Sequence, residues 1–124
     1  PVDYKICDEE AMKVKTIDNK IVEISKQIPC SEAEGEFIGI AKISKKALND
    51  IKHAAKILMQ QKKFTSYFEG AIEYLIKNED YKPTPISTNG EFWGEIDFME
   101  DYERVCESIS DELVNIAKRN DIGR

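Results

Sequence analysis

The stretch "MKVKTIDNKIVEISK", residues 12–26, decides the fold, because it alternates apolar and polar residues on both sides of a turn signal. Alternation with a period of two is typical of a half-buried strand. The Asp18–Asn19 pair between the two halves tolerates the positive φ of a tight turn. We therefore predict a β-hairpin. Its apolar or β-branched positions are Met12, Val14 and Thr16 before the turn and Ile21, Val22 and Ile24 after it.

Two further strands are expected outside the hairpin. Residues 27–35 read as a loop, and "EFIGIAKIS" at 36–44 follows as an apolar strand that contains Gly39. A glycine inside a strand marks a bulge or a close approach of backbone or ligand. The last strand is "EFWGEI" at 91–96, after a proline-containing loop.

Helical spacing of apolar residues identifies three helices. They are expected over 44–62, from Ser66 to about Asn78, and from Phe98 to the last turn at Lys118 and Arg119. Ser66 and Glu69 have the spacing of a capping box. The inward residues are expected to be Ala47, Ile51, Ala54, Ala55, Leu58 and Met59; then Phe68, Ile72, Leu75 and Ile76; then Phe98, Tyr102, Val105, Ile109, Leu113 and Ile116.

These elements predict an α/β fold with a mixed sheet: hairpin, strand, two helices, strand and C-terminal helix. The 124 residues suit a single domain, 1–124, or part of a larger protein. The net charge of −6 and the pI of about 4.9 argue against nucleic acid and anionic membranes as partners, since both need a positive field.

Three widely spaced cysteines, Cys7, Cys30 and Cys106, form no CxxC pair and no cluster with a histidine. This pattern supports neither a zinc site nor a disulfide framework, and reduced thiols suggest a cytoplasmic protein. No apolar run approaches the ~20 residues of a membrane span.

The most acidic stretch, "EFWGEIDFMED" at 91–101, leaves two interpretations of Asp97 open. Asp97 lies where the last strand is expected to give way to the last helix, so it can cap that helix, with Glu100 completing a capping box. It can also hold Mg²⁺, because ligands collect at the carboxyl ends of strands in open α/β sheets. The spacing alone favours the cap.

Other candidate side chains are isolated in the sequence. Lys26 ends the hairpin beside a loop, where an exposed lysine is the ordinary state. Glu36 opens the apolar strand and is either a pocket carboxylate or an exposed edge residue. The only histidine, His53, has no cysteine or second histidine near it, so a structural role is favoured.

Three motifs occur in an order that resembles a known family. They are "IVEISK" at 21–26, "GEFIGIAKIS" at 35–44 and "FWGEIDFMEDYERV" at 92–105. Together they resemble the C-terminal half of the sugar-nucleotidyltransferase-like superfamily, whose fold is GT-A-like and Rossmann-related. The nearest branch is the cytidylyltransferases that act on phosphocholine, 2-aminoethylphosphonate and similar small phospho- or phosphono-alcohols.

The resemblance implies a Mg²⁺-dependent transfer of a nucleotidyl group from CTP, or another NTP, to a small phosphorylated or phosphonate acceptor, with release of pyrophosphate. It implies that Asp97 is one of two aspartates that hold Mg²⁺ and that Lys26 contacts the acceptor phosphate. Glu36, Trp93 and Glu95 would line the acceptor pocket, and an aromatic ring among carboxylates suits a cationic amine.

The chain departs from the family pattern in lacking the nucleotide-binding half, with its Gly-rich loop and first metal aspartate. We therefore expect a fragment of a longer enzyme that is inactive alone. The alternative is a non-catalytic interaction module derived from the same fold, which self-associates, as a homodimer for example, through exposed strand edges.

Overall fold

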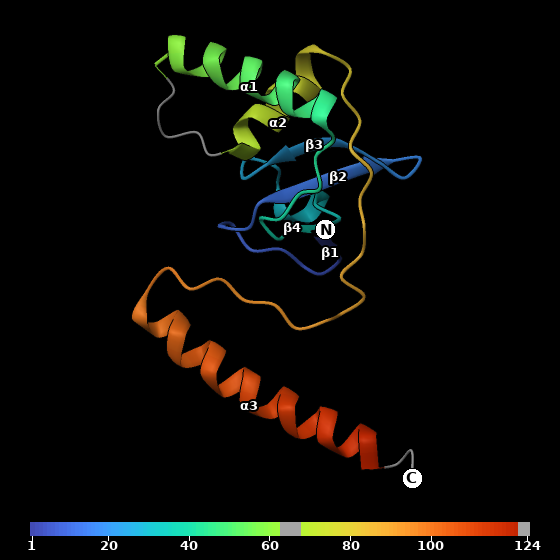
Figure 1. Ribbon diagram of the computed structural model, residues 1–124, viewed down its shortest axis with the longest axis vertical. Coiled ribbons are helices and arrows are strands. Elements are labelled where there is room, and N and C mark those ends of the chain that lie inside the picture. Colours follow the sequence, from blue (N-terminus) through green and yellow to red (C-terminus); the bar gives the residue numbers. More distant parts are fainter. Residues whose placement is uncertain (63–67, 122–124) are drawn as a thin grey trace. The chain divides into compact units, whose positions relative to one another are not determined.

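The computed structural model describes residues 1–62 and 68–121, with side chains in the last helix described as far as Asp111 (Figure 1). The chain divides into two compact units, Pro1–Gly90 and Glu91–Arg124. Each unit is considered by itself below, and the grouping of both into one domain stays a prediction.

The first unit is built on a four-stranded antiparallel sheet. Its strands are β1 (Val2–Asp3), β2 (Lys13–Ile17), β3 (Lys20–Ser25) and β4 (Gly35–Phe37), in the spatial order β1-β4-β2-β3. The expected hairpin is confirmed as β2 and β3. Asp18 and Asn19 form its turn with φ values of 50° and 57°, the left-handed pair that a two-residue hairpin requires.

Gly35 allows β1 to lie close to β4. A Cβ atom at this position would stand 2.6 Å from the backbone oxygen of Asp3 and 2.9 Å from Val2 Cγ1. Any other side chain would force the two strands apart, so the glycine before the apolar stretch serves strand packing.

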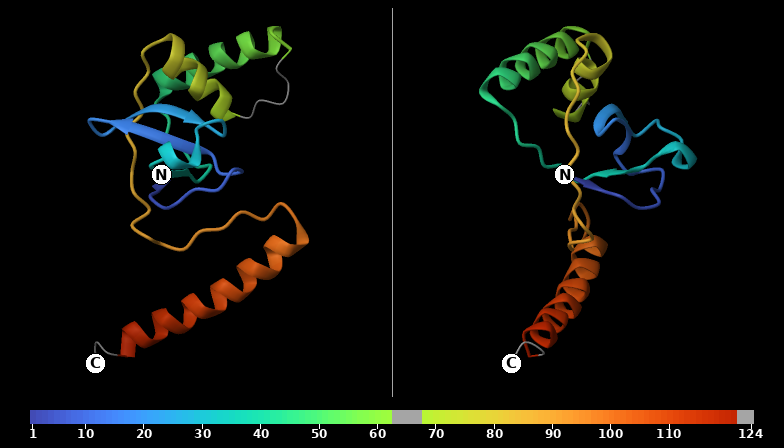
Figure 2. Two further views of the ribbon diagram at one scale, coloured as in Figure 1. Left: turned by 180° about the vertical axis from the view of Figure 1, so that it is seen from behind. Right: turned by 90° about the vertical axis from the view of Figure 1, so that its right-hand side faces the viewer.

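The two helices of the first unit lie on the same side of the sheet (Figure 2). Helix α1 (Lys45–Gln60) packs on α2 (Phe68–Asn78), and α2 packs on β3. The predicted start of α1 is confirmed, because the Ser44 hydroxyl accepts a hydrogen bond from the amide of Ala47. The predicted end of α2 is also confirmed, whereas Ser66 lies outside the described residues.

The core lies between the sheet and these helices. Its buried members are Val2, Val14, Ile21, Ile24, Phe37, Ile51, Ala54, Leu58, Ala71, Ile72 and Leu75. Of the residues expected to point inward, Met59 and Phe68 in this unit are exposed, and so are Phe98, Tyr102 and Ile109 in the second unit. Helix α1 is covered mainly by α2, so only a narrow stripe of it is buried, and Met59 lies outside that stripe.

The segment after α2 runs past both outer strands of the sheet. Val2 donates a hydrogen bond to the oxygen of Ile86 at 2.8 Å, and Thr88 donates to the oxygen of Val2 at 3.0 Å. At the other edge, Ile21 donates to the oxygen of Pro83 at 2.8 Å. The strand edges that the interaction-module alternative needs are therefore partly occupied by this segment.

The α/β class is confirmed, but two expected strands are wrong in extent. Residues 38–44 are irregular and Gly39 has a φ of 78°, so the strand expected over 36–44 stops at Phe37. Residues 91–96 form no strand. A strand needs a neighbouring strand along its length, and beyond Ile38, whose amide donates to the oxygen of Pro1 at 3.4 Å, residues 39–43 have no backbone hydrogen bond to another described residue. The mixed sheet is likewise wrong for the strands observed, where a single parallel bridge joins Val2 and Ser87.

The second unit consists of the irregular segment from residue 91 and helix α3 (Met99–Asp121). The C-terminal helix is thus confirmed. No helix among the described residues is long and apolar enough to cross a membrane.

Candidate functional site

Lys26 follows β3 and borders a cavity of about 340 Å³. The lining mixes charges of both signs: Glu9, Glu10, Lys13, Lys26, Gln27, Ile28, Pro29 and Cys30. The side chain of Lys26 is about half exposed, and its ammonium group lies 3.4 Å from the Glu10 carboxylate. An anion that enters this cavity would therefore meet a lysine held only by a solvated carboxylate.

Lys13, beside this cavity, is buried to 1% exposure and has a different role. Its Nζ donates to three backbone oxygens: to Glu9 at 2.8 Å, Ala11 at 3.2 Å and Lys26 at 3.0 Å. A lysine ammonium has three hydrogens, so all its donors are used. Lys13 therefore joins the loop before β2 to the end of β3 and is not available to bind a ligand directly.

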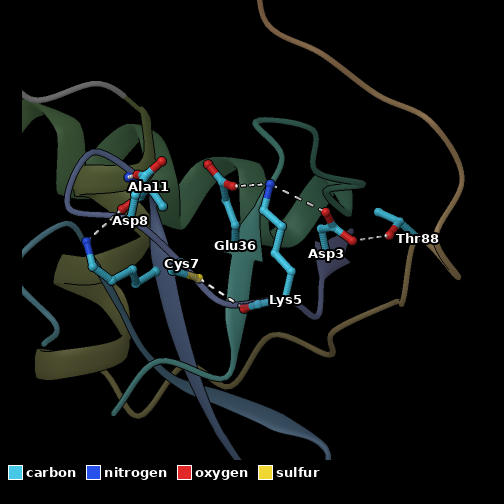
Figure 3. A network of polar contacts seen from close by, with 8 residues as sticks. Asp3, Lys5, Cys7, Asp8, Ala11, Glu36 and Thr88 are labelled. Atoms are coloured by element: carbon cyan, nitrogen blue, oxygen red, sulfur yellow. Dashed lines mark hydrogen bonds and ion pairs between the residues drawn. The ribbon is translucent and has the colours of Figure 1, made fainter. Parts of the chain in front are cut away.

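Glu36 belongs to a separate polar network on the sheet (Figure 3). Its carboxylate lies 2.9 Å from the ammonium group of Lys5, which also lies 3.5 Å from Asp3. Thr88 donates to the other oxygen of Asp3 at 3.0 Å. Burial lowers the pKa of Lys5, but hydrogen bonds and attraction from Glu36 and then Asp3 outweigh this effect and raise its pKa overall.

The thiol of Cys7 lies beside this network and points to the backbone oxygen of Lys5 at 3.6 Å (Figure 3). Burial, and then the negative charge of Glu36, raise the pKa of the Cys7 thiol. A protonated, buried thiol is a poor nucleophile, so Cys7 is a packing residue.

At the start of α3, backbone amides donate hydrogen bonds to the carboxylate of Asp101, and not to that of Asp97. The Oδ2 atom of Asp101 accepts from the amides of Phe98 at 3.0 Å and Asp97 at 3.2 Å. These two hydrogen bonds lower the pKa of Asp101, and Arg104 at 2.8 Å adds to the effect. The predicted cap by Asp97 and Glu100 is therefore wrong. Since α3 begins at Met99, Asp101 is the third helical residue, which is the position that bonds back to the cap amide in a capping box.

Asp97 is consequently left exposed at the end of the irregular segment. Its carboxylate makes no hydrogen bond or ion pair in the part of the chain that the structure describes. Glu95 is also exposed, and Trp93 is half-buried. Gly94 lies against Val105, where a Cβ atom would stand 2.8 Å from Cγ2, so this segment folds back on α3.

Mg²⁺ commonly takes one or two protein carboxylates and completes its shell with water and phosphate oxygens. Within residues 1–62 and 68–111, whose side chains are described, no group of three His, Cys, Asp or Glu side chains could hold a metal. Asp97 can therefore supply one ligand, but these residues do not form a metal site by themselves.

The predicted site residues belong to two different units, and within the first unit they have different surroundings. Lys26 borders the 340 Å³ cavity and Glu36 pairs with Lys5, both in the first unit. Trp93, Glu95 and Asp97 belong to the second unit. Sequence reasoning missed the roles of Lys5, Lys13 and Asp101. The spacing of Phe98 and Asp101 was a usable signal for the cap, whereas no sequence pattern shows that Lys13 is buried.

A larger cavity of about 720 Å³ lies in the first unit and is mostly apolar. Ile21, Ile24, Phe37 and Ile72 contribute from the sheet and α2, and residues 40–42 and 81–86 form its other sides. None of the predicted site residues borders it.

Comparison of the chain with protein-family models, with curated proteins and with solved structures gave no match. The resemblance to the nucleotidyltransferases therefore rests on the three motifs alone and stays a prediction.

Proposed function

We propose that this chain is the acceptor-binding part of a Mg²⁺-dependent nucleotidyltransferase. An oxygen of a small phospho- or phosphono-alcohol, or of a sugar phosphate, attacks the α-phosphorus of an NTP, with CTP preferred. The bond from that phosphorus to the bridging oxygen breaks, and pyrophosphate leaves. Such a displacement needs mainly alignment and charge neutralisation from the protein.

The observation that carries this proposal is that the carboxylate of Asp97 is exposed and does not cap helix α3. The helix start takes its hydrogen bonds from Asp101, so capping does not account for the Asp97 carboxylate. An exposed carboxylate directly before a helix, after an aromatic and acidic segment, supports its role as the Mg²⁺ aspartate that the resemblance implies.

Two segments with strand-like sequences that form no strand support the view that the chain is part of a larger enzyme. Residues 38–43 and 91–96 both have apolar strand-like sequences, and neither forms a strand. Within the first of them, residues 39–43 have no backbone hydrogen bond to another described residue, and Ile40 is 63% exposed beside the 720 Å³ cavity. A further group of strands, carrying the NTP site, would pair with such segments.

Lys26 is the proposed contact of the acceptor phosphate. Its cavity holds two glutamates and two lysines, and Lys13 is fully engaged with backbone oxygens. A phosphate would therefore bind by displacing Glu10 from Lys26, an exchange of one exposed ion pair for a stronger charge-assisted contact.

The test is pyrophosphate release from CTP and Mg²⁺ with a panel of phospho-amino alcohols, using the natural gene product that contains this sequence. Asp97→Asn is expected to lower kcat/KM by about two orders of magnitude or more, the usual scale for losing a group that stabilises transferred charge. Glu100→Gln is the matched control, since it removes an exposed carboxylate from the same helix start, and its kcat/KM should not change.

Lys26→Met is expected to raise the KM for the acceptor more than that for CTP. The 124-residue chain alone should release no pyrophosphate. A gene product that releases none with any NTP and acceptor, or an Asp97→Asn variant as active as Glu100→Gln, would contradict the proposal.

A second candidate function, the non-catalytic interaction module, is favoured by one observation in the second unit. Helix α3 and the residue before it carry large apolar side chains that are exposed, including Phe98 at 73% and Tyr102 at 53%. Large exposed apolar groups in one place are typical of an interaction surface.

A further inference from the structure

Helix α3 has an apolar stripe for which the second unit provides almost no cover. Tyr102, Val105 and Ile109 lie at spacings of three and four residues, which places them on one face of the helix. Phe98, directly before the helix, precedes Tyr102 by four residues and extends the same pattern. Of the apolar residues in this unit whose side chains are described, Val105 alone is buried. Leu113 and Ile116 continue the spacing along the sequence.

The charge along α3 is uneven. Its N-terminal part, residues 99–112, carries six acidic residues, Glu100, Asp101, Glu103, Glu107, Asp111 and Glu112, and one basic residue, Arg104. Near its end lie the basic residues Lys118 and Arg119 and one acidic residue, Asp121, so this end has a net charge of about +1. Two such helices side by side in parallel would bring the acidic parts together. In an antiparallel pair, each acidic part lies beside the basic end of the other helix, so charge favours this arrangement.

We propose that the stripe on α3 binds the same stripe of a second copy of this chain, as an antiparallel helix pair centred on Ile109. A two-fold axis at Ile109 places Val105 opposite position 113 and Tyr102 opposite position 116, because each pair is equally far from Ile109 along the helix. The same axis places Glu100 opposite Lys118. The 23 residues of α3 span about 35 Å, long enough for an extended seam of this kind.

The pairing of α3 differs from the strand-edge pairing considered above, because it uses a helix face in the second unit. It is also independent of the proposed nucleotidyltransferase function, since it rests on the apolar stripe and the charge of α3. The pyrophosphate assay and the test of association can therefore fail separately.

The test is sedimentation equilibrium of the 124-residue chain over a range of concentrations, with two variants. We expect a monomer–dimer equilibrium. Ile109→Asp should raise the dissociation constant by at least about 100-fold, because two buried charges would face each other at the axis. Ser110→Asp adds the same charge one residue along, away from the stripe, and should leave the constant within about threefold.

Circular dichroism of both variants is expected to match that of the parent chain, since Ile109 is 43% exposed and Ser110 is exposed. Oxidation tests the orientation with the native Cys106, which is exposed on α3. In the antiparallel pair the two Cys106 residues are six positions apart, about 9 Å along the axis, too far for a disulfide. In an in-register parallel pair, the two Cys106 residues lie at the same position along the helix axis, where oxidation can link them.

Three results would overturn the proposal. The first is a chain that stays monomeric at every concentration, which would mean that something else covers the stripe. The second is a dimer that Ile109→Asp does not weaken, since its interface would lie elsewhere. The third is a dimer that oxidation links through Cys106, because that would place the two helices parallel.

Discussion

Lys13 shows how a single residue can join two parts of the fold. Its ammonium group replaces water with three backbone oxygens, from the loop before β2 and from the end of β3. The sequence places Lys13 in a strand of alternating residues, where a lysine normally points to solvent. What buries it is the loop of residues 7–11, whose path depends on tertiary contacts and is not visible in the sequence.

Lys13→Met is expected to lower the free energy of unfolding of the first unit by about 2–4 kcal/mol, because the variant keeps the length of the side chain but leaves buried carbonyl oxygens unpaired. Urea denaturation of the variant and the parent chain measures this difference. Lys15→Met is the control. Lys15 is more exposed and its partners are glutamates at the surface, so the loss should stay below about 1 kcal/mol. Equal losses for both variants would contradict the role given to Lys13.

At the scale of elements, the predictions that rest on the hairpin turn and on the cap of α1 were correct. The predictions of strands that need a neighbouring strand were wrong in extent. The hairpin was predictable because Asp18 and Asn19 set its turn locally, and the Ser44 cap fixed the start of α1 in the same way. The strand expected at 91–96 has the right pattern, yet a strand exists only beside another strand. The predicted cap of α3 was one residue from the observed one, because the carboxylate that bonds back to the helix start is Asp101 instead of its neighbour Glu100, and spacing alone does not choose between adjacent acidic residues.

The start of α3 is expected to depend on pH through Asp101. Its pKa is lowered from 3.8 in the folded chain, because the ionised carboxylate accepts the amides of Phe98 and Asp97. The stabilisation is therefore present above pH 3.8 and is lost as the pH falls through the lower, folded pKa. In an NMR titration, the Phe98 amide signal should move with a midpoint below 3.8. A midpoint at or above that value, or an unchanged titration in Asp101→Asn, would contradict this assignment.

At the scale of the whole molecule, the buried core belongs to the first unit. Every member of the core cluster, from Val2 to Leu75, precedes residue 91. The candidate site residues were found from motifs in the sequence, but motifs do not show that they fall in two units.

A chain that ends at Gly90 is therefore expected to fold. Its thermal midpoint should lie within about 5 °C of that of the full chain, since less than about 1 kcal/mol of stability would be lost. Differential scanning calorimetry of both chains gives the comparison. A chain that ends before Pro83 is the control and should be much less stable, because it loses the hydrogen bonds to Ile21 and Val2. An unfolded 1–90 chain would show that the second unit supports the first.

The contact of residues 83–88 with the two outer strands has a consequence for the order in which the chain folds. Val2 and Ile86 are held together across almost the whole length of the first unit, so this contact closes a long loop, and closing it has an entropic cost. The β2–β3 hairpin can form early, because its strands are adjacent in sequence. During synthesis, the outer edge of β1 has no hydrogen-bond partner from this segment until residues 86–88 have left the ribosome. Until then this edge is free to pair with other chains, so the interval before residue 88 emerges is when aggregation threatens most.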